Sequence, residues 1–135
     1  MEQAAEIASQ KGARRVVMLP VSAPFHCSLM QPAADVMAEA LTRISIREPK
    51  VPIISNVTAT EVTDPDDIRT HLVKQVTAMV RWRESVLYMR EKNVDTLIEM
   101  GSGKVLSGLA RRISNDLTAR AIQNPNDFDS FVKDV

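Results

Sequence analysis

The chain has 135 residues, which is enough for one domain with a modest core. Its 17 basic and 17 acidic residues cancel, and only 4% of its residues are aromatic, so the composition disfavours binding to nucleic acid or to an anionic membrane. A single cysteine excludes an internal disulfide, and no apolar run is long enough for a membrane span, so we expect a globular protein of the cytoplasm.

The first 20 residues predict one helix and one strand. Residues 2–10 have a helix-forming composition and are followed by Gly12, a residue type common just after a helix. The short apolar run Val16–Leu19 predicts a strand that Pro20 closes.

A loop from residue 22 to residue 28 then leads into a second predicted helix. Ser28 and Gln31 have the spacing of a capping box, and Pro32 is tolerated in a first helical turn. Apolar residues then recur at helical spacing as far as Ile44.

The middle of the chain predicts one strand and two helices. The apolar run Val51–Ile54 predicts a buried strand. Asp64 opens a turn with an acidic helix start, and the helix is expected to run through Gln75. The next helix has an apolar stripe formed by Trp82, Val86 and Met89.

The last third alternates strand and helix. Strands are predicted at Thr96–Met100 and Ala119–Ile122, and a final helix at residues 126–132. Between the strands, the glycines at 101 and 103 predict a tight turn, because the full spacing of a phosphate-binding loop is missing. The helix after this turn is expected to turn five apolar side chains toward the core: Val105, Leu106, Leu109, Ala110 and Ile113. This alternation predicts an α/β fold with a largely parallel sheet.

Four segments carry a family resemblance: Leu19–Cys27, Val51–Val57, Leu72–Trp82 and Gly101–Leu106. In this order they resemble the malonyl-CoA:acyl-carrier-protein transacylase family. Family proteins are roughly twice as long as this chain, which resembles their C-terminal half.

The resemblance implies a fold and a division of the chain. Family members have a large α/β-hydrolase-like subdomain of three layers, into which a small ferredoxin-like subdomain is inserted. Residues 1–20 would be the last helix and strand of the small subdomain. Residues 21–135 would be the C-terminal portion of the large acyltransferase subdomain.

The resemblance also implies an activity in fatty acid biosynthesis. Such enzymes transfer malonyl from coenzyme A to the thiol of an acyl carrier protein through a serine ester, without a metal or a cofactor. The serine lies in a Gly-x-Ser-x-Gly motif. The glycines of this chain are at 12, 101, 103 and 108, so it has no such motif. We therefore expect the chain to be inactive alone and to need the missing N-terminal half as a partner.

The resemblance implies that two residues of this chain are catalytic. His26 would be the general base that takes the serine proton and returns it to the leaving thiolate. The backbone carbonyl of Gln75 would orient the ring by accepting a hydrogen bond from its other nitrogen. Cys27 follows His26, but adjacent side chains in an extended loop point in opposite directions, so we expect a packing role and no Cys–His pair.

Further residues are implied in binding. Phe25 would contact the malonyl group, and Arg14, Arg15 and Arg112 would dock the acidic carrier protein. Without the resemblance, His26 is a capping or surface residue, Phe25 is a core aromatic, and the arginines belong to solvated helix faces. Two other functions stay open: an acyltransferase piece of a polyketide synthase or split enzyme, and a non-catalytic module that binds carrier protein.

Overall fold

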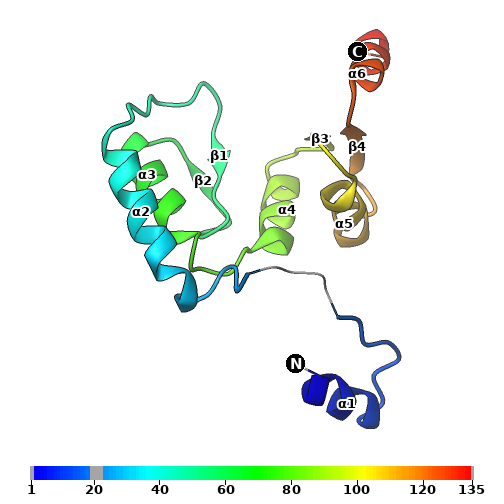
Figure 1. The fold of residues 1–135 in the computed structure, drawn as a ribbon. Helices are drawn as coiled ribbons and strands as arrows, with labels where there is room; N and C mark the ends of the chain where they lie inside the picture. The colour runs from blue at the N-terminus through cyan, green and yellow to red at the C-terminus, as the bar shows by residue number, and fades with distance from the viewer. Residues whose placement is uncertain (1, 19–22, 135) are drawn as a thin grey trace.

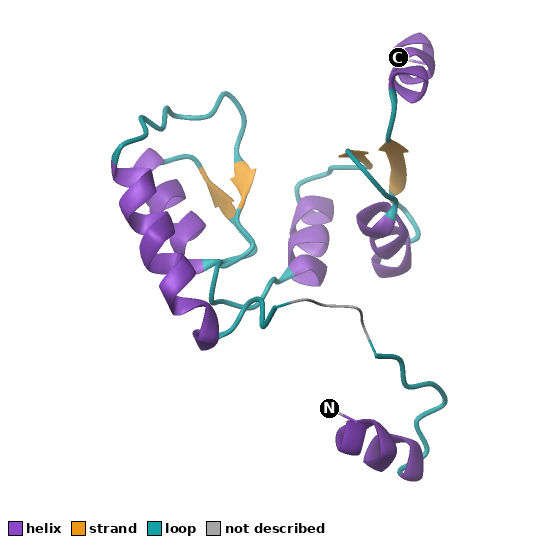
Figure 2. Ribbon diagram, viewed as in Figure 1, coloured by secondary structure: helices purple, strands orange, loops and turns teal. Residues whose placement is uncertain are grey.

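The computed structural model describes residues 2–18 and 23–134, which form an α/β arrangement of helices with two small sheets (Figures 1 and 2). The helices are α1 (Glu2–Gln10), the 3₁₀ turn η1 (Ser28–Met30), α2 (Gln31–Thr42), α3 (Pro65–Lys74), α4 (Trp82–Glu91), α5 (Val105–Ile113) and α6 (Pro125–Asp134). The strands are β1 (Ile53–Ile54), β2 (Glu61–Val62), β3 (Thr96–Met100) and β4 (Thr118–Ile122). Within the described ranges, no helix is long and apolar enough to cross a membrane.

Helices α2 and α3 lie side by side, and the β1–β2 hairpin lies beside α3, with a cavity between them (Figure 1). Asp64 caps the start of α3 as predicted, because its carboxylate accepts hydrogen bonds from the backbone N–H groups of Asp66 and Asp67. Arg69 of α3 donates hydrogen bonds to the carbonyls of Leu41 and Ile44, which lie at and just beyond the end of α2. These contacts fix α3, and with it the Gln75 peptide, against α2.

A second packing unit is formed by the parallel strands β3 and β4 with helices α4 and α5. The strands pair over their full length, from Thr96 opposite Thr118 to Met100 opposite Ile122. The core of this unit consists of Val86, Ala110, Leu117 and Ala119, with Trp82, Met89, Leu97 and Ile113 packed against it. The parallel pairing that was predicted from strand–helix alternation is confirmed here.

The N-terminal prediction is wrong in part. Helix α1 forms as expected, has no buried residue and lies apart from the other helices (Figure 1). Val16–Met18 form no strand, since a strand needs a neighbouring strand and none pairs with these residues; Leu19 and Pro20 lie outside the described residues.

The predicted capping box is also absent. Ser28 begins η1 and α2 starts at Gln31, with no side-chain cap on either. The Gln31 amide instead donates to the carboxylate of Asp35, one turn further along α2, at 2.8 Å. The start of the helix is therefore set by Pro32 in its first turn rather than by a capping box.

The middle strand differs most from its prediction. β1 has only two residues, pairs antiparallel with the unpredicted β2, and leaves Ile53 and Val51 exposed. Pro52 lacks a backbone N–H for strand pairing, and the chain turns back after Ser55. The expected single, largely parallel sheet is thus two separate two-stranded sheets in the described part of the chain.

Helix α5 does not point all of its apolar residues inward. Ala110 is buried and Ile113 is half-buried, but Val105, Leu106 and Leu109 are exposed. Met100, at the end of the adjacent β3, is also exposed. The segment from β3 to α5 therefore presents apolar side chains that no described element covers.

Candidate active site

His26 lies in the loop that leads into η1, in an uncommon backbone conformation. Its φ angle is +60°, in the left-handed region that few residues other than glycine adopt. Backbone strain of this kind is concentrated at functional sites. The side chain is exposed, so one face of the ring is open to a reacting group.

The partner of His26 is the end of helix α3. The last carbonyl groups of a helix accept no hydrogen bond from within the helix, so they can accept one from another donor. Gln75 follows α3 directly, and its carbonyl oxygen lies 2.9 Å from Nδ1 of His26. Since a carbonyl can only accept, Nδ1 carries the proton and Nε2 of the neutral ring has a free lone pair.

This contact joins two segments 49 residues apart in the sequence. It is the contact that the family resemblance implies between His26 and the Gln75 carbonyl. The arrangement presents a histidine of fixed tautomer whose Nε2 can accept a proton. The catalytic roles of the two residues stay predictions.

Phe25 and Cys27 flank the histidine in the sequence. Phe25 is 56% exposed and lines none of the cavities described below, so its place beside a bound acyl group stays a prediction. The Cys27 thiol donates to the carbonyl of Pro24 at 3.1 Å, not to His26. The sulfur is therefore engaged away from the ring, and the structure shows no Cys27–His26 hydrogen bond. The extended loop on which this prediction rested is instead a turn at residues 25–26, with His26 at a φ angle of +60°.

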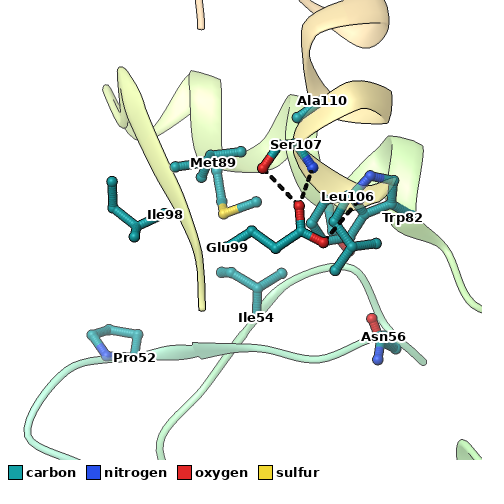
Figure 3. Close-up of a pocket in the computed structure, with 12 residues that line it drawn as sticks. Pro52, Ile54, Asn56, Trp82, Met89, Ile98, Glu99, Leu106, Ser107 and Ala110 are labelled. Atoms are coloured by element: carbon teal, nitrogen blue, oxygen red, sulfur yellow. Dashed lines mark hydrogen bonds between the residues drawn. The ribbon is translucent and has the colours of Figure 1, made fainter. Parts of the chain in front are cut away.

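A cavity of about 360 Å³ lies between the β1 segment, α4, β3 and α5 (Figure 3). Its walls are mainly apolar, with Ile54, Met89 and Leu97 among them, and His26 is not part of its lining. A smaller cavity of about 260 Å³ lies between the β1–β2 hairpin and α3, and Gln75 is in its lining. His26 thus lines neither cavity, but its hydrogen bond to Gln75 connects it to a residue that lines the second one.

Glu99 of β3 is a polar group in the first cavity that sequence reasoning missed. Its carboxylate accepts hydrogen bonds from the backbone N–H groups of Leu106 and Ser107 and from the Ser107 hydroxyl, at 3.2, 2.8 and 2.7 Å (Figure 3). The hydrogen bond from the Ser107 side chain, and then that from its backbone, lower the pKa of Glu99 below its usual value. Lys104 gives α5 no side-chain cap, so Glu99 supplies one from the neighbouring strand.

The arginines predicted to dock a carrier protein do not form one patch. Arg14 and Arg15 follow α1, whereas Arg112 is in the last turn of α5, and these segments lie apart in Figure 1. All three are exposed. In the described part of the chain, no group of three or more His, Cys, Asp or Glu residues could hold a metal ion.

Comparison with known proteins identifies relatives of the whole chain. No family model matches it. The malonyl CoA-acyl carrier protein transacylase of Escherichia coli K12 is 44% identical over 126 residues, which are 93% of this chain and 41% of that protein. The chain is homologous to part of the malonyl CoA-acyl carrier protein transacylases. The resemblance described from the four segments is confirmed.

Solved transacylase structures show the same relationship. The acyl-carrier-protein S-malonyltransferase of Bartonella henselae matches 98% of this chain with a TM-score of 0.88 and 49% identity. A malonyl-transacylase in complex with a type II PKS acyl-carrier protein matches 99% with a TM-score of 0.89 and 37% identity. The chain covers 42% and 43% of these two structures. It therefore spans about two fifths of the length of the transacylases that it matches.

Proposed function

We propose that this chain supplies the histidine of a malonyl-CoA:acyl-carrier-protein transacylase whose nucleophilic serine lies outside it. The observation that carries the proposal is the hydrogen bond from His26 Nδ1 to the Gln75 carbonyl. It leaves Nε2 as the proton acceptor that acyl transfer through a serine requires. The similarity to transacylases over nearly all of the chain supports the same role.

In the first half-reaction, Nε2 of His26 takes the proton of the serine hydroxyl as its oxygen attacks the thioester carbonyl of malonyl-CoA. The C–S bond then breaks, and the thiolate of coenzyme A leaves with the proton that His26 returns. The product is a malonyl-serine ester. During this step the Gln75 carbonyl faces the Nδ1–H of the imidazolium and stabilises its charge.

The second half-reaction runs the same proton path in reverse. His26 takes the proton of the carrier-protein thiol, whose sulfur attacks the serine ester. The C–O bond of the ester breaks, and the serine oxygen regains the proton from Nε2. The histidine acts twice and is unchanged, so it needs one fixed tautomer throughout the cycle.

The finer parts of the proposal concern binding and organisation. Phe25 contacts the malonyl group beside His26, while Arg14, Arg15 and Arg112 meet an acidic carrier protein at separate points. Residues 1–20 belong to a small ferredoxin-like subdomain, and residues 21–135 to a large α/β-hydrolase-like one. The well-separated positions of α1 and α5 suit two docking points rather than one.

A polyketide pathway is the second candidate for the carrier protein. It is favoured because one relative of known structure is bound to a type II PKS acyl-carrier protein. Fatty acid biosynthesis stays the first candidate because the curated relatives carry the transacylase name without a polyketide label. Assaying both kinds of carrier protein separates the two.

A chimeric enzyme tests the proposal. This chain would replace the matched region of the Escherichia coli transacylase, and transfer from malonyl-CoA to acyl carrier protein would be measured. Substituting His26→Ala should lower turnover by about 10²–10⁴, the usual contribution of general acid–base catalysis. Binding of malonyl-CoA should change little, because the base acts on a proton and not on the malonyl carboxylate.

The matched control is His71→Ala, which removes the other histidine of the chain. It should keep turnover within a few-fold of the unsubstituted chimera. An active chimera whose turnover survives the loss of His26 would contradict the proposed function.

A further inference from the structure

The Gln75 carbonyl belongs to a short linker, residues 75–81, between α3 and α4. Within this linker, the N–H groups of Thr77 and Ala78 bond back to the Lys74 carbonyl at 3.2 and 3.0 Å. These turns tighten the linker but leave its direction open. Helix α3 holds the Gln75 peptide from one side, because the N–H groups of Gln75 and Val76 donate to the carbonyls of His71 and Val73 at 2.9 and 3.2 Å. The linker is held from its other side by the β1–β2 turn.

The β1–β2 turn, residues 55–60, binds the linker at both ends. At the first end, the Asn56 amide donates to the Gln75 side-chain oxygen at 3.4 Å. At the last end, the backbone N–H of Arg81 donates to the Asn56 carbonyl at 3.2 Å. The Arg81 guanidinium also donates to the Thr58 carbonyl at 3.0 Å. We call this set of three hydrogen bonds the linker clamp.

The β1–β2 turn can serve as an anchor because it is closed by hydrogen bonds of its own and two of its residues are buried. The Ser55 N–H donates to the Thr60 carbonyl at 3.0 Å, and the Ala59 N–H donates to the Ser55 carbonyl at 2.8 Å. Ser55 and Ala59 are 6% and 4% exposed. Ala59 has a φ angle of +58°, a conformation that only a tightly determined turn maintains.

We propose that Arg81 and Asn56 are positioning residues that hold the Gln75 carbonyl against His26 through the linker clamp and so fix the tautomer of its ring. The margin is small, because a displacement of the carbonyl by about 1 Å moves the 2.9 Å contact beyond hydrogen-bonding distance. This inference rests on the proposed function for its catalytic meaning, but the geometry it concerns is measurable without activity.

Nuclear magnetic resonance of the ring nitrogens tests the clamp directly. The chain has two histidines, His26 and His71, so labelling histidine with ¹⁵N gives two pairs of ring-nitrogen signals. At about pH 8, where a histidine ring of ordinary pKa is neutral, long-range correlations show which nitrogen carries the proton. In the unsubstituted chain His26 should be protonated at Nδ1.

In Arg81→Ala and in Asn56→Ala, His26 should change to a mixture in which Nε2–H is substantially populated. The control is Arg83→Ala, an exposed arginine in the first turn of α4, which should leave the His26 signals unchanged. Unchanged His71 signals show that the fold is intact. Asn56→Ala removes the hydrogen bond to the Gln75 side chain and keeps the bond from the Arg81 N–H to the carbonyl of residue 56. If Arg81→Ala unfolds the chain, Asn56→Ala still tests the linker clamp.

The clamp is refuted if folded Asn56→Ala keeps His26 wholly protonated at Nδ1. The same result in folded Arg81→Ala would refute the role of the arginine. A merely stabilising residue would lower the melting temperature without altering the tautomer of the folded chain. A fixed tautomer in an inactive chimera would instead contradict the proposed function and leave the clamp standing.

Discussion

The exposed apolar segment from β3 to α5 should make this chain self-associate. Met100 and Val105 keep 70% and 69% of their surface accessible, and Leu106 and Leu109 keep 44% and 39%. Full burial of one such side chain contributes about 1.5–3 kcal/mol. Covering the exposed part of all four therefore contributes roughly 3–7 kcal/mol per copy, or roughly 6–13 kcal/mol for a dimer that covers both copies.

This gain is close to the cost of association, which is about 4–15 kcal/mol in lost translational and rotational freedom. The balance predicts weak, concentration-dependent association, with a dissociation constant on the order of micromolar to millimolar. The second edge of β3, which pairs only with β4 among the described strands, adds backbone groups that another chain can bond. Sedimentation measured over a wide range of concentrations would follow the association.

The double substitution Val105→Glu with Leu109→Lys should weaken this association. It leaves the net charge unchanged and places an acid four residues before a base on α5, which supports the helix. Removing these two side chains from the contact costs a dimer roughly 3–6 kcal/mol, so affinity should fall at least about 100-fold. The matched control is Phe128→Glu with Val132→Lys, the same change on the exposed face of α6, which should leave the affinity unchanged. An unsubstituted chain that sediments as a clean 15.0 kDa monomer and melts cooperatively at ordinary domain temperatures of about 45–65 °C would refute the reasoning.

Three other predictions follow from single side chains. Phe25→Ser in the chimera should narrow the preference for malonyl over methylmalonyl, since discrimination of one methyl is worth roughly 1–3 kcal/mol. The control Phe128→Ser should leave the ratio of the two kcat/KM values unchanged. An unchanged ratio in Phe25→Ser as well would show that Phe25 does not contact the acyl group. The lowered pKa of Glu99 contributes stability that is present above the ordinary glutamate pKa and is lost as pH falls through the lowered value. Glu99→Gln should therefore destabilise the chain at neutral pH and much less in acid, and equal losses of unfolding free energy at both pH values would disprove the cap. Asp64→Ala should reduce the unfolding free energy by about 1 kcal/mol by uncapping α3, and denaturant titration showing no loss would contradict that role.

The elements that were predicted well are those whose signals are local. β3 begins and ends where its apolar run does, between Thr96 and the glycine turn. Asp64 followed by a proline is a helix start that depends on neighbouring residues alone, and the structure has it. Gly101 and Gly103 have φ angles of +133° and +100°, which explains why glycine occupies both turn positions.

What could not be predicted depends on distant partners. β2 forms because residues 55–60 close a turn in which Ala59 takes a glycine-like conformation, and no local pattern indicates this. The apolar residues of α5 have helical spacing, but which of them are covered depends on what packs against the helix. Periodicity predicts a face, not whether a partner is present to bury it.

The site divides in the same way. His26 and Gln75 were named through the family resemblance, and the structure shows the hydrogen bond between them. Arg81 and Asn56 were parts of matched segments without an assigned role, and Glu99 carried no signal at all. Their contacts join residues that are distant in the sequence, so only the folded chain shows them.

Intact-protein mass spectrometry after mixing with malonyl-CoA tests the central claim most directly. The isolated chain should acquire no stable malonyl adduct, because it contains no nucleophilic serine elbow. In the chimera, an adduct should form on the serine of the Escherichia coli portion, and His26→Ala should slow its formation by about 10²–10⁴. A stable malonyl adduct on the isolated chain, or formation in the chimera at an undiminished rate without His26, would contradict the account.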